Sequence, residues 1–355
     1  MIGPSESGGL PGKPAAFFLE LMMHNKYAKP ACLKNAKGQV RRVGFELEFA
    51  GLDLKTAATV LAQAVRGSVE EDTQAECKVK HPDWGDFKIE LDWQFGKTLA
   101  RRRLEEKDGV ENATEDAILG LLTDVARQIV PLEVVCPPVP ADQLATLDPM
   151  VSALRSAGAL GTSDSLIYAF GLHINTEIPD FDSATLVAYL KAYCVAQNWL
   201  VKAHRVDMLR RLTPYIDPYP KRYMQTVMGY SPDTPVQQIM DDYLAHNPTR
   251  NRGLDLLPLF KHMDPDRVLA AVHDERVNAR PTFHYRLPNC EIEQPDWGLT
   301  ESWNIWCMVE YLAATPAVLK SMCEQWTAYD QNLINLQEEP WHTELTQIHG
   351  ELLSA

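Results

Sequence analysis

The chain has 355 residues, of which 45% are hydrophobic and 23% are charged, and its formal net charge is −14. These values are typical of a soluble globular protein that is long enough for two domains or for one large domain with insertions. The negative charge excludes general binding to a nucleic-acid backbone, and no apolar run approaches the roughly 18 residues of a membrane helix.

The cysteines and the N-terminus indicate the compartment. Seven cysteines are an odd number and form no CxxC pair, which argues for reduced thiols and against a disulfide framework or a thiolate zinc site. The first residues lack the basic start, apolar core and cleavage site of a signal peptide. We therefore expect a cytoplasmic protein whose partners include neither a membrane nor a nucleic acid.

Hydrophobic periodicity gives the expected elements in chain order. Residues 1–40 are expected to be an N-terminal extension that is loose where Gly, Pro and Ser dominate. Period-two alternation then predicts strands at 42–51, 86–95, 131–137, 166–178 and 281–288. Helical periodicity predicts helices at 54–66, 114–129, 141–157, 182–205, 234–246 and 264–273, and two or three more after residue 300. Strands separated by helices, with antiparallel-type alternation, predict an α+β fold in which helices cover one face of the sheet.

A segment crowded with proline and tyrosine lies between Thr213 and Thr234. We expect a long loop here, which is either a lid or binding loop or a plain surface excursion. The segment carries Lys221 and Arg222, which are surface charges by default and phosphate-binding residues if the loop is a lid.

The polar faces of the predicted strands share an unusual composition. An ordinary solvated face carries Thr, Ser, Lys and Gln, whereas these faces carry mainly acids, His, Asn and Arg. In the opening strand, VGFELEF, the apolar residues Phe45 and Leu47 alternate with Glu46 and Glu48. The polar side chains of the five strands are Glu46, Glu48, Lys88, Glu90, Asp92, Glu133, His173, Asn175, Glu177, His284 and Arg286.

Carboxylates gathered on one face raise each other's pKa unless cations neutralise them. Oxygen-rich clusters with an occasional imidazole suit Mg²⁺ or Mn²⁺. The sequence has neither GxxxxGK[ST] nor a strand–GxGxxG–helix unit, so a nucleotide would bind here through metal ions on the sheet. The plainer interpretations are a solvated strand face, a core histidine at His173 and a structural partner of the carboxylates at Arg286.

Four short blocks between residues 44 and 292 carry a family resemblance. They are GFELEF (44–49), IELDWQF with LEVVCPPV (89–95 and 132–139), FGLHINTEI (170–178) and RVNARPTFHYRLPNCEI (276–292). With these blocks the chain resembles the amidoligase family of carboxylate–amine ligases, which are relatives of glutamine synthetase and of glutamate–cysteine ligase. The blocks are similar, in order, to the family's Gly-x-Glu-x-Glu strand, its Asp-bearing strand with the Glu-bearing strand that follows, its Gly-x-His-x-Asn strand and its last Arg-bearing strand.

The resemblance implies a fold and an activity. The fold would be the curved, mainly antiparallel sheet of the glutamine synthetase catalytic domain with helices on its outer face. Residues 41–355 would form one catalytic domain with a helical insertion at about 180–275. The activity would be ATP-dependent amide-bond formation with Mg²⁺ or Mn²⁺, through an acyl phosphate, on small-molecule or peptide carboxylate and amine substrates. Glutamine synthetases assemble into rings, but no feature of this sequence identifies a ring interface, so the oligomeric state stays open.

The resemblance also implies roles for individual residues. Asn175 would contact nucleotide or metal, and Lys221 and Arg222 are the candidates for holding phosphate from the proline-rich loop. Arg286 would stabilise the transferring phosphoryl group, and Asp92 would bind a second metal or the amine. Glu133 would be both a metal ligand and a catalytic residue. The implied metal ligands are Glu46, Glu48, Glu133, His173 and His284.

Departures from the family pattern leave alternatives open. His284 stands where the family usually has a glutamate, and an imidazole ligates a divalent ion without supplying negative charge. Glu90, Glu291 or Glu293 would then restore the missing carboxylate. The alternatives to a ligase are an inactive relative that only binds its ligands and a metal-dependent hydrolase that uses no nucleotide.

Overall fold

The computed structural model describes residues 26–71, 73, 75–91, 131–162, 170–206, 210, 216–331 and 339–354. In this part of the chain the fold is mixed α/β, with an open, mainly antiparallel sheet and ten α-helices. None of the helices described is both long and apolar enough to cross a membrane.

The sheet has β1 near its middle, and every named pair of strands is antiparallel. The short strand β6 (Val139–Pro140) pairs with the start of β1 off the main path. The remaining order is β2 (Ser68–Glu71), β3 (Glu76–His81), β4 (Gly85–Leu91), β5 (Leu132–Val135), β1 (Arg42–Phe49), β7 (Leu172–Glu177), β9 (Thr282–Tyr285) and β8 (Leu254–Asp255).

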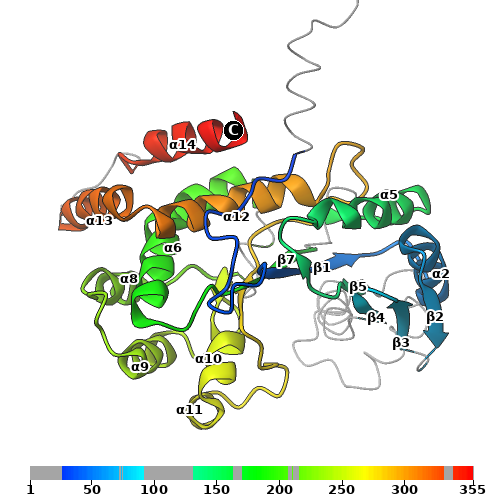
Figure 1. Ribbon diagram of the computed structural model, residues 1–355, viewed down its shortest axis with the longest axis horizontal. Helices are drawn as coiled ribbons and strands as arrows, with labels where there is room; N and C mark the ends of the chain where they lie inside the picture. Colours follow the sequence, from blue (N-terminus) through cyan, green and yellow to red (C-terminus); the bar gives the residue numbers. More distant parts are fainter. Residues whose placement is uncertain are drawn as a thin grey trace, which may run out of the picture.

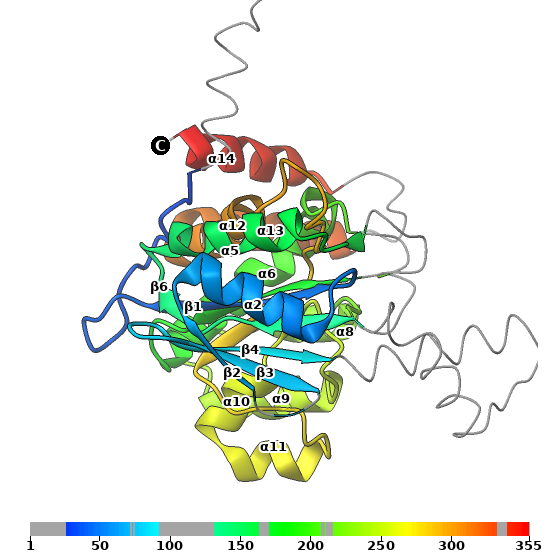
Figure 2. The ribbon, with the colours of Figure 1, turned by 90° about the vertical axis from the view of Figure 1, so that its right-hand side faces the viewer.

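One face of the sheet is apolar and lies under helices. Phe45, Leu47 and Phe49 of β1 are completely buried, as the alternation predicts, because burial of large apolar side chains is the main stabilising term. Their cross-strand partners, such as Ile174 and Leu132, are completely buried as well. Figure 2 shows the covering helices on this side, which are α2 (Leu54–Val65), α5 (Asp148–Ser156), α6 (Ser183–Ala203) and α12 (Leu299–Ala314).

A buried ion pair fixes the central strand to two of these helices. Arg41, just before β1, makes a bidentate pair with Glu310 of α12 at 2.7 and 2.8 Å, and both side chains are fully buried. Tyr189 of α6 donates to the same carboxylate at 2.5 Å, and Trp306 donates at 3.2 Å. The pair is therefore compensated by hydrogen bonds, as a buried pair must be if it is not to destabilise the fold. Beyond it, α13 (Pro316–Gln331) and α14 (His342–Ser354) contact α6 and α12.

A second group of helices lies at the β8 end of the sheet, seen at the lower left of Figure 1. Aromatic side chains pack in edge-to-face contacts within it, among them Tyr223, Tyr243 and Phe260. The group consists of α8 (Lys221–Met228), α9 (Val236–His246), α10 (Leu257–Met263) and α11 (Pro265–Ala271).

Most expected elements are present with shifted ends. The helix predicted at 54–66 is α2, and Asp53 is its N-cap, since the Asp53 side chain accepts from the Thr56 amide. The expected helix at 141–157 divides into a 3₁₀ turn, Leu144–Leu147, and α5. Three helices follow residue 300, as expected. The strand expected at 86–95 is described only as far as Leu91, and the helix expected at 114–129 lies outside the described residues.

The prediction of a long loop between residues 213 and 234 is wrong. α8 occupies Lys221–Met228, and its buried residues Tyr223, Met224 and Val227 have the spacing of one helical face against α6. The flanking prolines hide this short helix because they are compatible both with a loop and with a helix start. The strands β2, β6 and β8 and the helix α10, which are short, were also missed. The strand β3 was missed too, although Cys77 and Val79 alternate there with Lys78 and Lys80.

Candidate functional site

The second face of the sheet gathers polar side chains from neighbouring strands. Opposed residues of antiparallel strands project to the same side, and Glu46 of β1 lies opposite His173 of β7. Glu48 lies opposite Glu133 of β5, which in turn lies opposite Glu90 of β4. The register therefore brings together the acids and the histidine that alternation alone assigns to one face.

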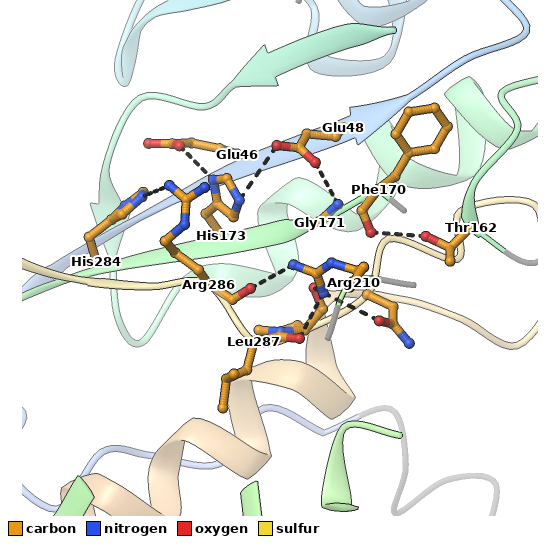
Figure 3. Close-up of polar contacts among 12 residues, drawn as sticks. Glu46, Glu48, Thr162, Phe170, Gly171, His173, Arg210, His284, Arg286 and Leu287 are labelled. Atoms are coloured by element: carbon orange, nitrogen blue, oxygen red, sulfur yellow. Dashed lines mark hydrogen bonds and ion pairs between the residues drawn. The ribbon is translucent and has the colours of Figure 1, made fainter. Parts of the chain in front are cut away.

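His173 bridges the two glutamates of β1, as Figure 3 shows. Its Nδ1 lies 3.0 Å from Glu46 Oε2, and its Nε2 lies 3.5 Å from Glu48 Oε1. Burial and the nearby Arg286 lower the pKa of His173, against the pull of the two carboxylates, so the imidazole is neutral. A neutral ring that donates through Nδ1 to Glu46 leaves the lone pair of Nε2 directed at Glu48.

This arrangement suits a divalent cation between His173 and Glu48. The ligand atoms of Glu48, Glu133 and His173 lie within 4.8 Å of one another, and we call these residues the Glu48 cluster. The two carboxylates are hard oxygen ligands of the kind that Mg²⁺ and Mn²⁺ prefer, and the imidazole adds one nitrogen ligand of intermediate softness. A metal-binding histidine commonly donates its other ring nitrogen to a carboxylate, and Glu46 supplies that carboxylate here.

Glu46 is itself surrounded by donors. Its Oε1 accepts from Asn175 Nδ2 at 2.9 Å and lies 3.1 Å from Arg280 Nη1. Burial alone would raise the pKa of Glu46, but the hydrogen bond from His173 and the positive charge of Arg280 hold it well below the usual value. Glu46 is therefore an ionised carboxylate that orients His173 and is shared with a guanidinium, although it also lies within ligand distance of His173 and His284.

His284 continues the same network toward Arg286. Its Nδ1 lies 2.8 Å from Asn175 Oδ1, and Arg286 Nη1 lies 3.0 Å from its Nε2. Burial, with Arg280 and Arg286, lowers the pKa of His284 well below the usual value in spite of Glu46. Both ring nitrogens thus have protein partners, so His284 is less available for a metal than His173 is.

The backbone that carries the site is held by Arg210, at the lower part of Figure 3. This buried guanidinium donates to the carbonyl oxygens of Arg286, Leu287 and Pro288 at 2.6–2.8 Å. The Gly171 amide donates to Glu48 Oε2 at 2.6 Å, and a Cβ at this glycine would lie 2.9 Å from Arg210 Nη2. A larger residue at position 171, just before β7, would therefore have to displace the guanidinium of Arg210.

Sequence reasoning missed Arg280, Arg210 and Asp255 as residues around the site. Asp255 of β8 lies opposite His284 and is fully buried, and burial raises its pKa to about 6. Arg280 stands within the RVNARPTFHYR block, four residues before His284, and this position is the one signal that the sequence offered. Asp255 belongs to a strand of two residues, which is too short to show a periodic pattern.

Some predicted site residues lie elsewhere. Lys221 begins α8 and pairs with Asp330 of α13 at 2.7 Å, and the neighbouring Arg222 is exposed, so the structure does not bring them to the Glu48 cluster. Asp92 lies outside the described residues. Glu291 accepts from Asn289 and Glu293 accepts from the Gly161 amide, which leaves Glu90 as the extra acid beside the cluster.

Comparison with known proteins identifies the family. The family model described as putative amidoligase enzyme matches residues 39–308. This match includes every described residue of the network, from Glu46 to Arg286. Comparisons with curated proteins and with solved structures give no significant match. The matched region spans well over half of the chain, and the chain belongs to the amidoligase family.

Proposed function

We propose that the protein is an ATP-dependent carboxylate–amine ligase that works through an acyl phosphate. The observation that carries this proposal is the Glu48 cluster, two carboxylates and a neutral imidazole, beside the guanidiniums of Arg280 and Arg286. Phosphoryl transfer needs these two components, a site for divalent cations and fixed positive charge near the phosphate. The family match supports the choice of amide-bond formation among phosphoryl-transfer reactions.

The donor set fits a divalent metal ion. Glu48, Glu133 and His173 would hold it, with Glu46 fixing the imidazole through Nδ1. When bound, Mg²⁺ or Mn²⁺ neutralises charge on the phosphate oxygens. Glu46 already interacts with the Arg280 guanidinium, whereas Glu48 faces Nε2 of the His173 ring, and we therefore place the metal at the Glu48 cluster.

In the proposed reaction a carboxylate oxygen of one substrate bonds to the γ-phosphorus of ATP as the bond to ADP breaks. The amine nitrogen of the second substrate then attacks the acyl carbon, loses a proton and releases inorganic phosphate. Arg286 is held by the His284 ring and by its own carbonyl hydrogen bond to Arg210, so its guanidinium is oriented before the substrate arrives. Such preorganised donors stabilise charge that develops in the transition state.

The test is ADP release by the purified protein with Mg-ATP and pairs of amino acids or small peptides. The proposal requires release that depends on both substrates and is abolished by EDTA and by Glu48→Gln. Glu324→Gln, an exposed substitution on α13, is the matched control and is expected to retain activity.

The alternatives give different results in the same assay. An inactive relative would bind Mg-ATP without releasing ADP, and a metal-dependent hydrolase would cleave amides with metal and without ATP. Either result would replace the ligase proposal.

A further inference from the structure

A small cavity lies beside the loop that leads into β8. It has a volume of about 230 Å³ and lies between the loop before β8 and the loop after α11. Its polar side chains, which define the Arg250 pocket, are those of Thr249, Arg250, Asn251, His273, Asp274 and Arg276.

The loop before β8 is connected directly to the site. The Gly253 carbonyl oxygen accepts from the Arg286 amide at 2.8 Å, and the next two residues form β8, where Asp255 lies opposite His284. Arg250 is thus three residues from the backbone contact that holds Arg286. The two guanidiniums are close enough to repel each other, which contributes to the lowered pKa of Arg250.

The cations of the two loops around the cavity differ in how they are compensated. Arg276 is neutralised by Asp274, with contacts of 2.8 Å from Nε and 2.6 Å from Nη2. Arg252 donates to the Pro218 and His246 carbonyl oxygens. The side chain of Arg250 has no hydrogen bond or ion pair with any residue that the structure describes, although it is half-buried.

A half-buried guanidinium without a hydrogen-bond partner is incompletely solvated, and a bound anion would stabilise it. Burial, and then Arg286 and Arg276, lower the pKa of Arg250, while Asp255 and Asp274 oppose them only in part. The neutral donors Thr249 and Asn251 lie beside it in the same wall. The fork of a guanidinium matches the two oxygens of a carboxylate.

We propose that the Arg250 pocket binds a second carboxylate of a ligase substrate, remote from the reacting atoms, so that the enzyme acts on an acidic amino acid or a related small acid. This inference rests on the proposed function. The cavity volume is that of about seven or eight water molecules, which suits one small anionic group. It is smaller than the roughly 300–1,000 Å³ of sites that enclose larger ligands, so the pocket is too small for a whole nucleotide.

The test measures binding without ATP. Thermal shifts of the wild type are recorded with succinate, L-aspartate and L-glutamate, each beside its amide, which is succinamate, L-asparagine and L-glutamine. At least one acid is expected to raise Tm more than its amide, and Arg250→Ala is expected to weaken the binding of that acid by about 10-fold to 100-fold. Arg250→Lys retains the positive charge but loses the planar guanidinium, so its affinity for the acid should lie between those of the wild type and Arg250→Ala. Lys320→Ala on α13 removes one exposed positive charge and should bind like the wild type.

Several outcomes would overturn the proposal. These are the absence of any difference between acid and amide in the wild type, or unchanged binding of the acid in Arg250→Ala. If Arg250→Ala no longer binds ADP or orthophosphate but still binds the acid, the pocket belongs to a nucleotide phosphate instead.

The two proposals can fail separately. If Mg-ATP stabilises the protein and no acid does, the pocket proposal fails and the ligase proposal stands. If an acid binds through Arg250 and Mg-ATP is neither bound nor turned over, the ligase proposal fails.

Discussion

Glu48→Gln is expected to stabilise the metal-free protein while destroying its response to Mg²⁺. The glutamine keeps an oxygen that accepts from the Gly171 amide, so the backbone contact survives. It also replaces a carboxylate oxygen 3.5 Å from the His173 Nε2 lone pair with an amide group that donates to this nitrogen. The substitution therefore removes repulsion in the metal-free state and removes a ligand from the metal-bound state.

The magnitude follows from the separation of the charges. The carboxylate oxygens of Glu48 and Glu133 lie within 4.8 Å of each other. At this distance two charges repel by about 3.5 kcal/mol at an effective dielectric constant of about 20, and by about 0.9 kcal/mol in bulk water. The side chain of Glu48 is 18% exposed, so the free energy by which Glu48→Gln stabilises the metal-free protein lies between these limits. For 355 residues, a change of about 0.75 kcal/mol in the free energy of unfolding shifts Tm by one degree. Glu48→Gln is therefore predicted to raise Tm by about 1–5 °C.

Thermal unfolding after EDTA treatment and again with Mg²⁺ measures both effects. When Mg²⁺ is present at 100 times its Kd, the free energy of unfolding of the wild type should rise by about 2.7 kcal/mol. That of Glu48→Gln should hardly change. Glu324→Gln, on the exposed side of α13, should match the wild type in both conditions. A variant that is less stable than the wild type without metal, or that responds to Mg²⁺ as the wild type does, would refute the assignment of Glu48.

Three further substitutions test other parts of the structure. Arg286→Lys keeps the charge and loses the fork, so ADP release should fall by about 100-fold or more with Tm unchanged within about 1 °C; a loss of stability instead would make Arg286 structural. Glu310→Gln leaves the buried Arg41 without its counter-charge and should lower Tm by about 4–7 °C, measured by calorimetry, whereas a Tm equal to that of the wild type would contradict the role of this pair. The folded-state pKa of Asp255 is raised to about 6, so its contribution to stability is lost as pH rises from about 4 to about 6. Asp255→Asn should therefore be more stable than the wild type by about 3 kcal/mol at neutral pH, and urea unfolding that shows no gain would contradict the raised pKa.

The central strands could be predicted because alternation acts through a physical constraint. Burying Phe45 and Leu47 forces Glu46 and Glu48 to the opposite face, whatever the rest of the chain does. The same argument places His173 and Asn175 together on β7. The sequence thus predicts which strands carry the polar groups and which way they point.

The partners of these groups could not be predicted in the same way. The register that sets Glu48 opposite Glu133 depends on packing between strands, which alternation does not specify. Arg280 interacts with Glu46 from a segment just before β9, and Arg250 belongs to a loop between α9 and β8. Residues in such segments have no period, so their positions follow from the tertiary fold alone.

The expectation for His284 changes most when these partners are known. In the sequence alone, His284 replaces a glutamate of the family pattern and supplies no negative charge, which suggests a weakened metal site. In the structure Asn175 and Arg286 contact its two ring nitrogens, and the cation site that we propose is the Glu48 cluster, which has two carboxylates. The substitution therefore affects the orientation of Arg286 more directly than it affects metal binding.

The transfer of oxygen from a substrate carboxylate to phosphate tests the proposed ligase reaction most directly. The protein is incubated with Mg-ATP, an amine donor and amino acids whose carboxylates carry oxygen-18, and the released phosphate is examined by mass spectrometry. Formation of an acyl phosphate, followed by attack of the amine, predicts that each phosphate carries one labelled oxygen. Release of ADP with unlabelled phosphate, or amide formation without ADP, would contradict the proposed reaction.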